Sequence, residues 1–397
     1  MQKTALILSG GGARGAYQVG VLKGLSEIVK SIGIDNPFQI LSGTSAGAIN
    51  TAQLAAASDN FETAIEKLIY LWSNLTPEQI FKADILSMNK FSLSSLLGVG
   101  GSRSQAFSMN SLLDTSPLEK LIEKSCDFSQ IQKNLDSRKY ESIIITANNY
   151  IEGSAVSFIQ TAQVFDSEKL NWGDSRRKPI QTVLNLNHIL ASTAIPILFP
   201  PILVNGEYYG DGCVRNNTPC SPALRLGAEK LFVIGVRTQK PKNNLSTESL
   251  DQTKDRSKTE KKQTVSMIRI LNTLLNAVML DSVEQDVQRI QRINQLVDGS
   301  QKNQSLKKIP ALCISPSRNI GEIARERSHK LPRILRMTIS AFGNLDEASE
   351  IISYLMFEST FCKQLIDMGY EDAFNNKQQI LQFFSQSDLK SDFAENL

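Results

Sequence analysis

Residues 4–15 read TALILSGGGARG, so a short apolar run, Thr4–Leu8, leads directly into a turn rich in glycine. A second apolar run, Phe38–Leu41, leads in the same way into residues 42–47, SGTSAG. Short apolar runs without polar alternation are typical of parallel strands that are covered on both faces. Because each run ends in a glycine-rich turn, the two stretches predict an α/β fold in which both turns lie at one edge of the sheet.

The segment between these strands predicts a helix over Ala13–Ile32. Its apolar residues Val19, Leu22, Val29 and Ile32 have spacings that place them on one helical face, and Gly33 is a suitable residue to end the helix. Strand, helix and strand together form a βαβ unit.

Further along the chain, the pattern predicts a core over residues 1–237 with the architecture of a three-layer α/β/α sandwich around a mostly parallel sheet. It contains predicted helices at Ala46–Ala57 and Phe61–Leu75 and predicted strands at Ser142–Ala147, Ala155–Ile159 and Leu231–Val236. Residues 238–264 are polar and nearly free of apolar side chains, which predicts a flexible loop. Residues 265–397 form a mainly helical region that completes or packs on the core, with a long helical stretch at Val265–Val297, a strand at Ile309–Ile314 and a mostly helical segment over Ile320–Met368.

Composition limits the classes of protein to consider. The chain has 397 residues, 41% of them hydrophobic, and a net charge of +3, so we expect a globular protein without a nucleic-acid partner. No apolar run is long enough to span a bilayer, and no secretory signal follows Met1, so we expect a cytoplasmic protein. Five scattered cysteines without metal-ligand spacing favour reduced thiols, with no disulfide, no metal and no cofactor.

The glycine-rich turn alone has two interpretations. Gly10, Gly12 and Gly15 have the G-x-G-x-x-G spacing that dinucleotide-binding folds also use. In such folds the next strand ends in an acidic residue that binds ribose, whereas here it leads into Gly43-Thr44-Ser45-Ala46-Gly47. Gly-x-Ser-x-Gly between a strand and a helix presents a serine hydroxyl on a sharp turn. We therefore predict that Ser45 is a nucleophile, and a dinucleotide-binding oxidoreductase becomes the weaker alternative.

A serine hydroxyl needs a base, and the chain has only two histidines, His188 and His329. His188 falls at a predicted helix start and His329 in a basic segment outside the core, so both are weaker candidates. Asp211 in Tyr208-Tyr-Gly-Asp-Gly212 is the stronger candidate, as a carboxylate at a strand end. The alternative is that Asp-Gly only closes a hairpin.

Together these segments resemble the patatin-like phospholipases, lipid acyl hydrolases that use a Ser–Asp dyad. Gly10-Gly11-Gly12-Ala13-Arg14-Gly15 is similar to that family's oxyanion-hole motif, Gly43–Gly47 to its nucleophile elbow and Asp211-Gly212 to its acidic motif. Ala191–Pro196 resembles a segment that the family has between the elbow and the acid. Cys213 departs from the glycine or alanine usual in the family, and it would strain the backbone if this position required a positive φ. The resemblance covers residues 4–237.

The resemblance implies an acyl-enzyme mechanism on a lipid or phospholipid substrate. Asp211 would take the proton of Ser45, and N–H groups around Gly11, Gly12 and Ala13 would stabilise the oxyanion. An apolar acyl groove would dehydrate the carboxylate and raise its pKa. A lipid acyltransferase and a catalytically impaired lipid-binding protein remain as alternatives.

Three further segments have open roles. Arg14 lies in the first helical turn, where the helix dipole disfavours a cation, so we expect a structural ion pair rather than contact with a lipid phosphate. Phe91–Val99 has the pattern of an apolar cover or of a buried helix. The run Arg325–Arg336 is more typical of a solvated helix face than of a surface lying on an anionic membrane, but it leaves peripheral membrane contact open.

Overall fold

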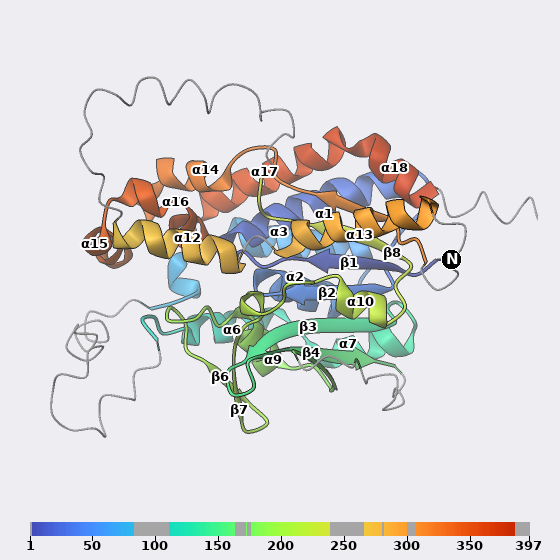
Figure 1. Ribbon diagram of the computed structural model, residues 1–397, viewed down its shortest axis with the longest axis horizontal. Helices are drawn as coiled ribbons and strands as arrows, with labels where there is room; N and C mark the ends of the chain where they lie inside the picture. The colour runs from blue at the N-terminus through green and yellow to red at the C-terminus, as the bar shows by residue number, and fades with distance from the viewer. Residues whose placement is uncertain are drawn as a thin grey trace, which may run out of the picture.

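The structure is a computed structural model that describes residues 2–82, 111–162, 172, 176–238, 266–279, 282–299 and 307–385 (Figure 1). The segment Phe91–Val99 and nearly all of the polar loop 238–264 lie outside these ranges. Within the described part of the chain, the strands form one sheet. They are β1 Thr4–Leu8, β2 Ile40–Thr44, β3 Ser142–Asn149, β4 Ser154–Thr161, β5 Arg177–Gln181, β6 Ile202–Val204, β7 Glu207–Asp211, β8 Lys230–Ile234 and β9 Ala311–Ile314.

The order of the strands is β5-β4-β3-β2-β1-β8-β9, with β7 paired to β3 and β6 paired to β7. The five strands β3, β2, β1, β8 and β9 are parallel to their neighbours in that run, whereas β4 and β7 are antiparallel to β3. The sheet is therefore mostly parallel, and the carboxyl ends of β1 and β2 lie at the same edge.

Helices cover both faces of the sheet. They are α1 Gly15–Lys30, α2 Ala46–Ala55, α3 Phe61–Ser73, α6 Ser116–Ser125, α7 Phe128–Asp136, α9 Leu186–Thr193, α10 Ser221–Arg225, α12 Met267–Met279, α13 Ser282–Gly299, α14 Ile320–Glu326, α15 Arg333–Phe342, α16 Ser349–Leu355, α17 Ser359–Asn375 and α18 Lys377–Ser385. Short 3₁₀ turns are η1 Gly12–Arg14, η2 Pro77–Gln79, η3 Gly212–Val214, η4 Ser328–Lys330 and η5 Leu345–Ala348.

The two faces of the sheet belong to two separate cores. In β1, Leu6 and Leu8 join the larger core, which includes α1, α3, α17 and α18, while Ala5 and Ile7 join the smaller core against α10 and α13. Because neighbouring side chains of a strand point to opposite faces, an unbroken apolar run serves both cores at once. This arrangement is the predicted three-layer α/β/α sandwich.

The first helix is more deeply buried than its sequence pattern predicts. Helix α1 begins at Gly15 after the turn η1, and it ends at Lys30, so Ile32 lies beyond it and is exposed. Instead of one apolar face, nearly all of α1 is buried, because the sheet lies on one side and α17 on the other. A Cβ on Gly20 would meet the carbonyl oxygen of Ile366 in α17 at 1.9 Å, so this close packing requires a glycine.

The predicted helical stretch Val265–Val297 is helical in the structure, where it contains the two helices α12 and α13. Ile268 and Met279 of α12 pack into the larger core, whereas Val283, Val287 and Ile290 of α13 pack into the smaller one. One straight helix does not reach two cores on opposite faces of a sheet. The run Arg325–Arg336 is likewise divided, between α14, η4 and α15.

Candidate active site

Ser45 stands at the sharp turn between β2 and α2. Its backbone has φ 55° and ψ −124°, a left-handed conformation that is strained for a residue with a side chain. The flanking glycines allow the turn because they let backbone segments approach closely. A Cβ on Gly47 would lie 2.2 Å from the carbonyl oxygen of Leu8, and a Cβ on Gly43 would lie 2.3 Å from that of Gly47. The turn therefore holds Ser45 in a fixed position at the edge of the sheet.

The register of β3 explains how Asp211 reaches Ser45. Thr44, the last residue of β2, pairs with Thr146 of β3, and Asp211, the last residue of β7, pairs with the next residue, Ala147. Strands β2 and β7 thus pair with the same edge of β3, β2 with its first part and β7 with its last part, and they run in opposite directions. The two strands meet end to end, and residues far apart in the sequence come together at this junction.

The Ser45 hydroxyl donates a hydrogen bond of 2.6 Å to Oδ2 of Asp211. The other carboxylate oxygen, Oδ1, accepts the N–H of Cys213 at 2.9 Å. Both residues are buried, with Asp211 0% and Ser45 2% exposed. Burial raises the pKa of Asp211 to about 6, against the opposing effect of its hydrogen bonds. The carboxyl group is therefore a stronger base than an ordinary aspartate.

The segment Ala191–Pro196 is bonded to both residues of the pair. Oγ of Ser192 accepts the N–H of Ser45 at 2.9 Å and donates to the carbonyl oxygen of Thr146 at 2.6 Å. The carbonyl oxygen of Ala194 accepts the N–H of Asp211 at 2.8 Å. Ser192 is a positioning residue that the sequence pattern alone did not assign, although the resemblance had marked its segment.

The glycine-rich turn lies directly beside the serine. A Cβ on Gly10 would be 2.8 Å from Cβ of Ser45 and 2.3 Å from Sγ of Cys213. Gly12 and Ala13 are the first residues of η1, so their N–H groups have no partner within that turn. Gly12 also lines the groove into which Ser45 opens. The arrangement offers main-chain donors next to the hydroxyl.

Cys213 does not introduce the strain considered above. It has no positive φ, so a residue with a side chain adopts this backbone without difficulty. Its buried thiol lies against both Gly10 and the Asp211 carboxylate, and burial raises the pKa of the thiol well above its usual range. The thiol is therefore protonated at neutral pH and packs as a small neutral group.

Neither histidine lies in this arrangement. His188 is the third residue of α9, where its Nδ1 accepts the N–H of Asn185 at 3.1 Å. The centroid of its ring lies 4.5 Å from the centroid of the Phe158 ring. Burial lowers its pKa to about 4. His329 is exposed in η4. His188 thus caps a helix in the neutral form.

Arg14 is buried beneath the glycine-rich turn and does not line the groove. Its guanidinium forms an ion pair with Glu350 and donates to Oγ of Ser353 from Nε at 2.8 Å. It also donates to the carbonyl oxygen of Val236 at 3.3 Å. The expected structural ion pair is confirmed, and its acidic partner Glu350 comes from α16, far along the chain.

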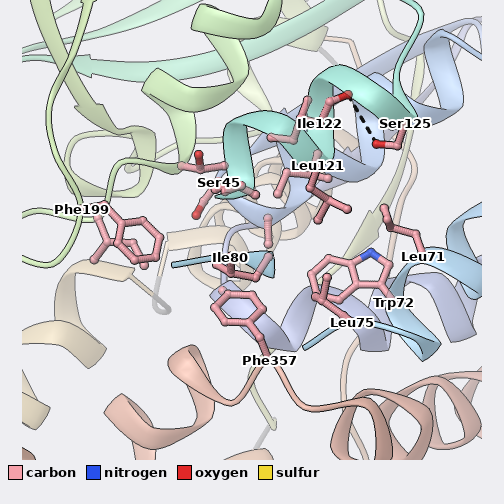
Figure 2. Close-up of a pocket in the computed structure, with 16 residues that line it drawn as sticks. Ser45, Leu71, Trp72, Leu75, Ile80, Leu121, Ile122, Ser125, Phe199 and Phe357 are labelled. Carbon is pink, nitrogen blue, oxygen red and sulfur yellow. Dashed lines mark hydrogen bonds between the residues drawn. The ribbon is translucent and has the colours of Figure 1, made fainter. Parts of the chain in front are cut away.

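An apolar groove opens at Ser45 and holds about 550 Å³ of space, part of it open to solvent (Figure 2). Figure 2 shows Ser45 at the groove wall, with the side chains of α3 and α6 and the ring of Phe357 around the space. The lining is almost entirely apolar: Gly12, Ala46, Ile49, Leu71, Trp72, Leu75, Ile80, Leu118, Leu121, Ile122, Ser125, Thr193, Ile195, Phe199 and Phe357. Such a groove suits an acyl chain.

Two classes of feature are absent from the described part of the chain. No group of three or more His, Cys, Asp or Glu side chains there has an arrangement that holds a metal ion. Among the helices of the described ranges, none is both long and apolar enough to cross a bilayer. The five cysteines, Cys126, Cys213, Cys220, Cys313 and Cys362, are all free thiols.

The fold and the glycine-flanked serine turn define an α/β protein with a nucleophile-elbow geometry. A family model described as Patatin-like phospholipase matches residues 6–224, more than half of the chain. The chain belongs to the patatin-like phospholipase family.

Two curated relatives come from viruses. The chain is 26% identical over 215 residues to Uncharacterized protein R571 of Acanthamoeba polyphaga mimivirus, which covers 54% of this chain and 59% of the relative. It is 26% identical over 225 residues to Probable lipid hydrolase 463L of Invertebrate iridescent virus 6, which covers 57% of this chain and 64% of the relative. In both cases the match spans less than two thirds of the relative.

Two solved structures show weak likeness. VipD from Legionella pneumophila matches with a TM-score of 0.36 and 12% identity, over 95% of this chain and 67% of that one. Human GIVD cytosolic phospholipase A2, in complex with methyl gamma-linolenyl fluorophosphonate, matches with a TM-score of 0.34 and 13% identity, over 97% of this chain and 59% of that one.

Proposed function

We propose that the protein hydrolyses carboxylic esters of lipids or phospholipids, with Ser45 as nucleophile and Asp211 as general base. The observation that carries the proposal is the hydrogen bond of 2.6 Å from the Ser45 hydroxyl to the Asp211 carboxylate, at the wall of an apolar groove. Family membership supports a lipid substrate.

The reaction begins when Oγ of Ser45 attacks the ester carbonyl carbon while Asp211 takes the hydroxyl proton. The carbonyl oxygen becomes an oxyanion, which the N–H groups of Gly12 and Ala13 stabilise. Collapse of this intermediate breaks the ester bond, and the alkoxide leaves with the proton from Asp211. Water then attacks the acyl carbon while Asp211 takes one of its protons. The bond between Oγ of Ser45 and the acyl group breaks, Asp211 returns the proton to Oγ, and the fatty acid is released.

The surroundings of the dyad support this assignment. Asp211 is fully buried and has a pKa of about 6, so at neutral pH it is ionised yet basic enough to accept a proton. An acyl chain in the groove displaces water from the same space, and each buried methylene contributes about 0.8 kcal/mol to binding. The groove thus provides affinity for lipid chains and a dry environment for the base.

The test is hydrolysis of a chromogenic fatty-acyl ester by the wild type, Ser45→Ala and Asp211→Asn. We expect both variants to lose at least about 10³-fold in kcat, because the hydroxyl and its base act as a unit. Ser125→Ala is a matched control, since Ser125 also lines the groove but its hydroxyl accepts from Gln53 rather than facing a carboxylate. Its kcat should stay within about twofold of the wild type, the small effect expected for a residue outside the dyad.

All four proteins must give the same circular dichroism spectrum. A Ser45→Ala protein that keeps the wild-type rate contradicts the proposal outright. If Ser45→Ala loses activity and Asp211→Asn does not, Ser45 remains the assigned nucleophile and the assignment of Asp211 as the base is contradicted.

A further inference from the structure

Helix α12 has apolar residues on two faces. Ile268 and Met279 are buried in the larger core, with Leu275 partly buried beside them. On another face Met267, Ile270, Leu274 and Val278 are 64%, 47%, 57% and 39% exposed. Their spacing of three or four residues aligns them along one side of the helix. We call these four residues the α12 stripe. A contiguous exposed apolar surface of this kind marks an interaction site.

The charged residues of α12 and of its neighbour α15 are all arginines, and one of them, Arg269, pairs with Glu347 of the adjoining turn η5. Helices α12 and α15 contact each other, and Arg269, Arg333 and Arg336 are their charged residues, with no aspartate or glutamate in either helix. Met337 of α15 is 72% exposed. Apolar side chains with flanking arginines are typical of helices that lie in the headgroup region of an anionic membrane.

The stripe belongs to a helix that is held firmly beside the candidate active site. Oδ1 of Asn272 accepts the N–H of Ile351 in α16 at 3.2 Å, and α12 also contacts η3, the turn that follows Asp211. Leu275 and Met279 enclose a small apolar cavity together with Ile195, which also lines the groove. Figure 1 shows α12 and α15 toward the same end of the molecule.

We propose that the α12 stripe, with Met337 and the arginines of α15, is the surface by which the protein binds an anionic lipid bilayer. The four apolar side chains enter the boundary of the acyl chains, and the arginines meet lipid phosphates. The inference is tested by two experiments. A measurement of vesicle binding depends on the surface alone, and a measurement of hydrolysis rests also on the proposed function.

A second copy of the chain fits this surface less well than a bilayer does. In a two-fold symmetric dimer the same patch meets itself, so the arginines of one α12–α15 pair would face those of the other. Like charges brought together in a partly dehydrated interface repel each other. An anionic membrane complements both the apolar stripe and the positive charge.

The binding arm uses flotation with phosphatidylcholine vesicles, with and without phosphatidylserine. The stripe variant is the double substitution Ile270→Ser/Leu274→Ser. The control variant is Ile151→Ser/Leu203→Ser, which changes two exposed apolar residues in the β3–β4 and β6–β7 hairpins. Both are compared with the wild type. We expect the stripe variant to bind phosphatidylserine vesicles roughly tenfold or more weakly than the wild type, because two apolar side chains no longer enter the lipid. The control variant should bind as the wild type does, and raised salt should weaken wild-type binding.

The activity arm measures hydrolysis of phospholipid in the same vesicles and of a water-soluble short-chain ester. The stripe variant should lose vesicle hydrolysis in proportion to its lost binding and should keep wild-type kcat/KM on the soluble ester. If the wild type hydrolyses neither substrate, the proposed function fails, and the flotation result still judges the surface on its own.

Three outcomes overturn the inference. The first is wild-type vesicle binding by the stripe variant. The second is a wild-type dimer, without lipid, that the stripe variant converts to a monomer by light scattering, which assigns the surface to a second copy. The third is a clearly lower melting temperature of the stripe variant than of the control variant, which means that the chain itself covers the stripe.

Discussion

At the scale of single residues, the site depends on a carboxylate in a dry position. Asp211 is completely buried, and apart from the Ser45 hydroxyl its oxygens are bonded to the backbone N–H of Cys213. No cation pairs with it among these contacts, so burial dominates and raises its pKa to about 6. Without that shift, an aspartate would be a weak base for a serine hydroxyl.

The raised pKa predicts the pH dependence of the reaction. Below about pH 6 the carboxyl group holds a proton and accepts none from Ser45, so kcat/KM on a non-ionising ester should fall tenfold per pH unit on the acid side. Above that value the base is fully ionised and the rate should be level. A pH–rate profile of the wild type measures the pKa at which kcat/KM falls on the acid side. A value near that of an ordinary aspartate, about 4, would contradict a dehydrated Asp211.

At the same scale, the sequence gives the residue types but not their partners. Ser45 and Asp211 stand out because glycines flank each of them. Nothing in the sequence indicates that Ser192 receives the N–H of Ser45, because a serine within a helix has many local partners. That assignment needs the packing of α9 against β3.

At the scale of elements, the meeting of β2 and β7 along β3 creates the site. The apolar runs of β1 and β2 are readable from the sequence because buried parallel strands need few polar residues. The end of a strand at Asp211 is readable too, but β6 and the pairing of β6 with β7 are not, since this hairpin is short and partly exposed and carries polar residues such as Asn205 and Glu207. The antiparallel entry of β7 is set by pairing with β3, which is a long-range contact.

Helix α16 also shapes the site, by supporting the glycine-rich turn from below. A Cβ on Gly12 would lie 2.3 Å from the carbonyl oxygen of Tyr354, so the turn rests on the backbone of α16. Arg14, at the end of η1, is bonded to Ser353 and paired with Glu350. These contacts fix the direction of the main-chain donors of Gly12 and Ala13.

Glu350→Gln and Ser353→Ala should therefore reduce turnover although neither residue lines the groove. We expect kcat to fall about tenfold with KM little changed, because misplaced oxyanion donors weaken the transition state rather than substrate binding. Glu350→Gln should also lower the free energy of unfolding by about 3 kcal/mol, since it leaves a buried arginine without its counter-ion.

Steady-state kinetics and urea unfolding measure the two effects. Thr360→Ala is the control, because Thr360 accepts a hydrogen bond from exposed Arg327 in the same region of the chain. Wild-type kcat in both Glu350→Gln and Ser353→Ala would show that α16 does not orient the turn.

At the scale of the whole molecule, the region after residue 265 is interwoven with the rest of the chain. Strand β9 extends the sheet beside β8, α17 covers α1, and α16 supports the glycine-rich turn. The sequence predicts a strand and helices here, but not which face of the sheet each one covers. The predicted helical stretch Val265–Val297 is an example, because only the two cores reveal that its helices α12 and α13 belong to opposite faces.

The central claim is that the Ser45 hydroxyl, at the point where β2, β7 and the glycine-rich turn meet, is the reactive nucleophile. The most direct measurement is reaction of the intact protein with a long-chain alkyl fluorophosphonate, followed by mass spectrometry of the peptides. The account predicts a single adduct on Ser45, absent from Ser45→Ala and formed far more slowly in Asp211→Asn. An adduct on another residue of the folded wild type, or none at all, would contradict it.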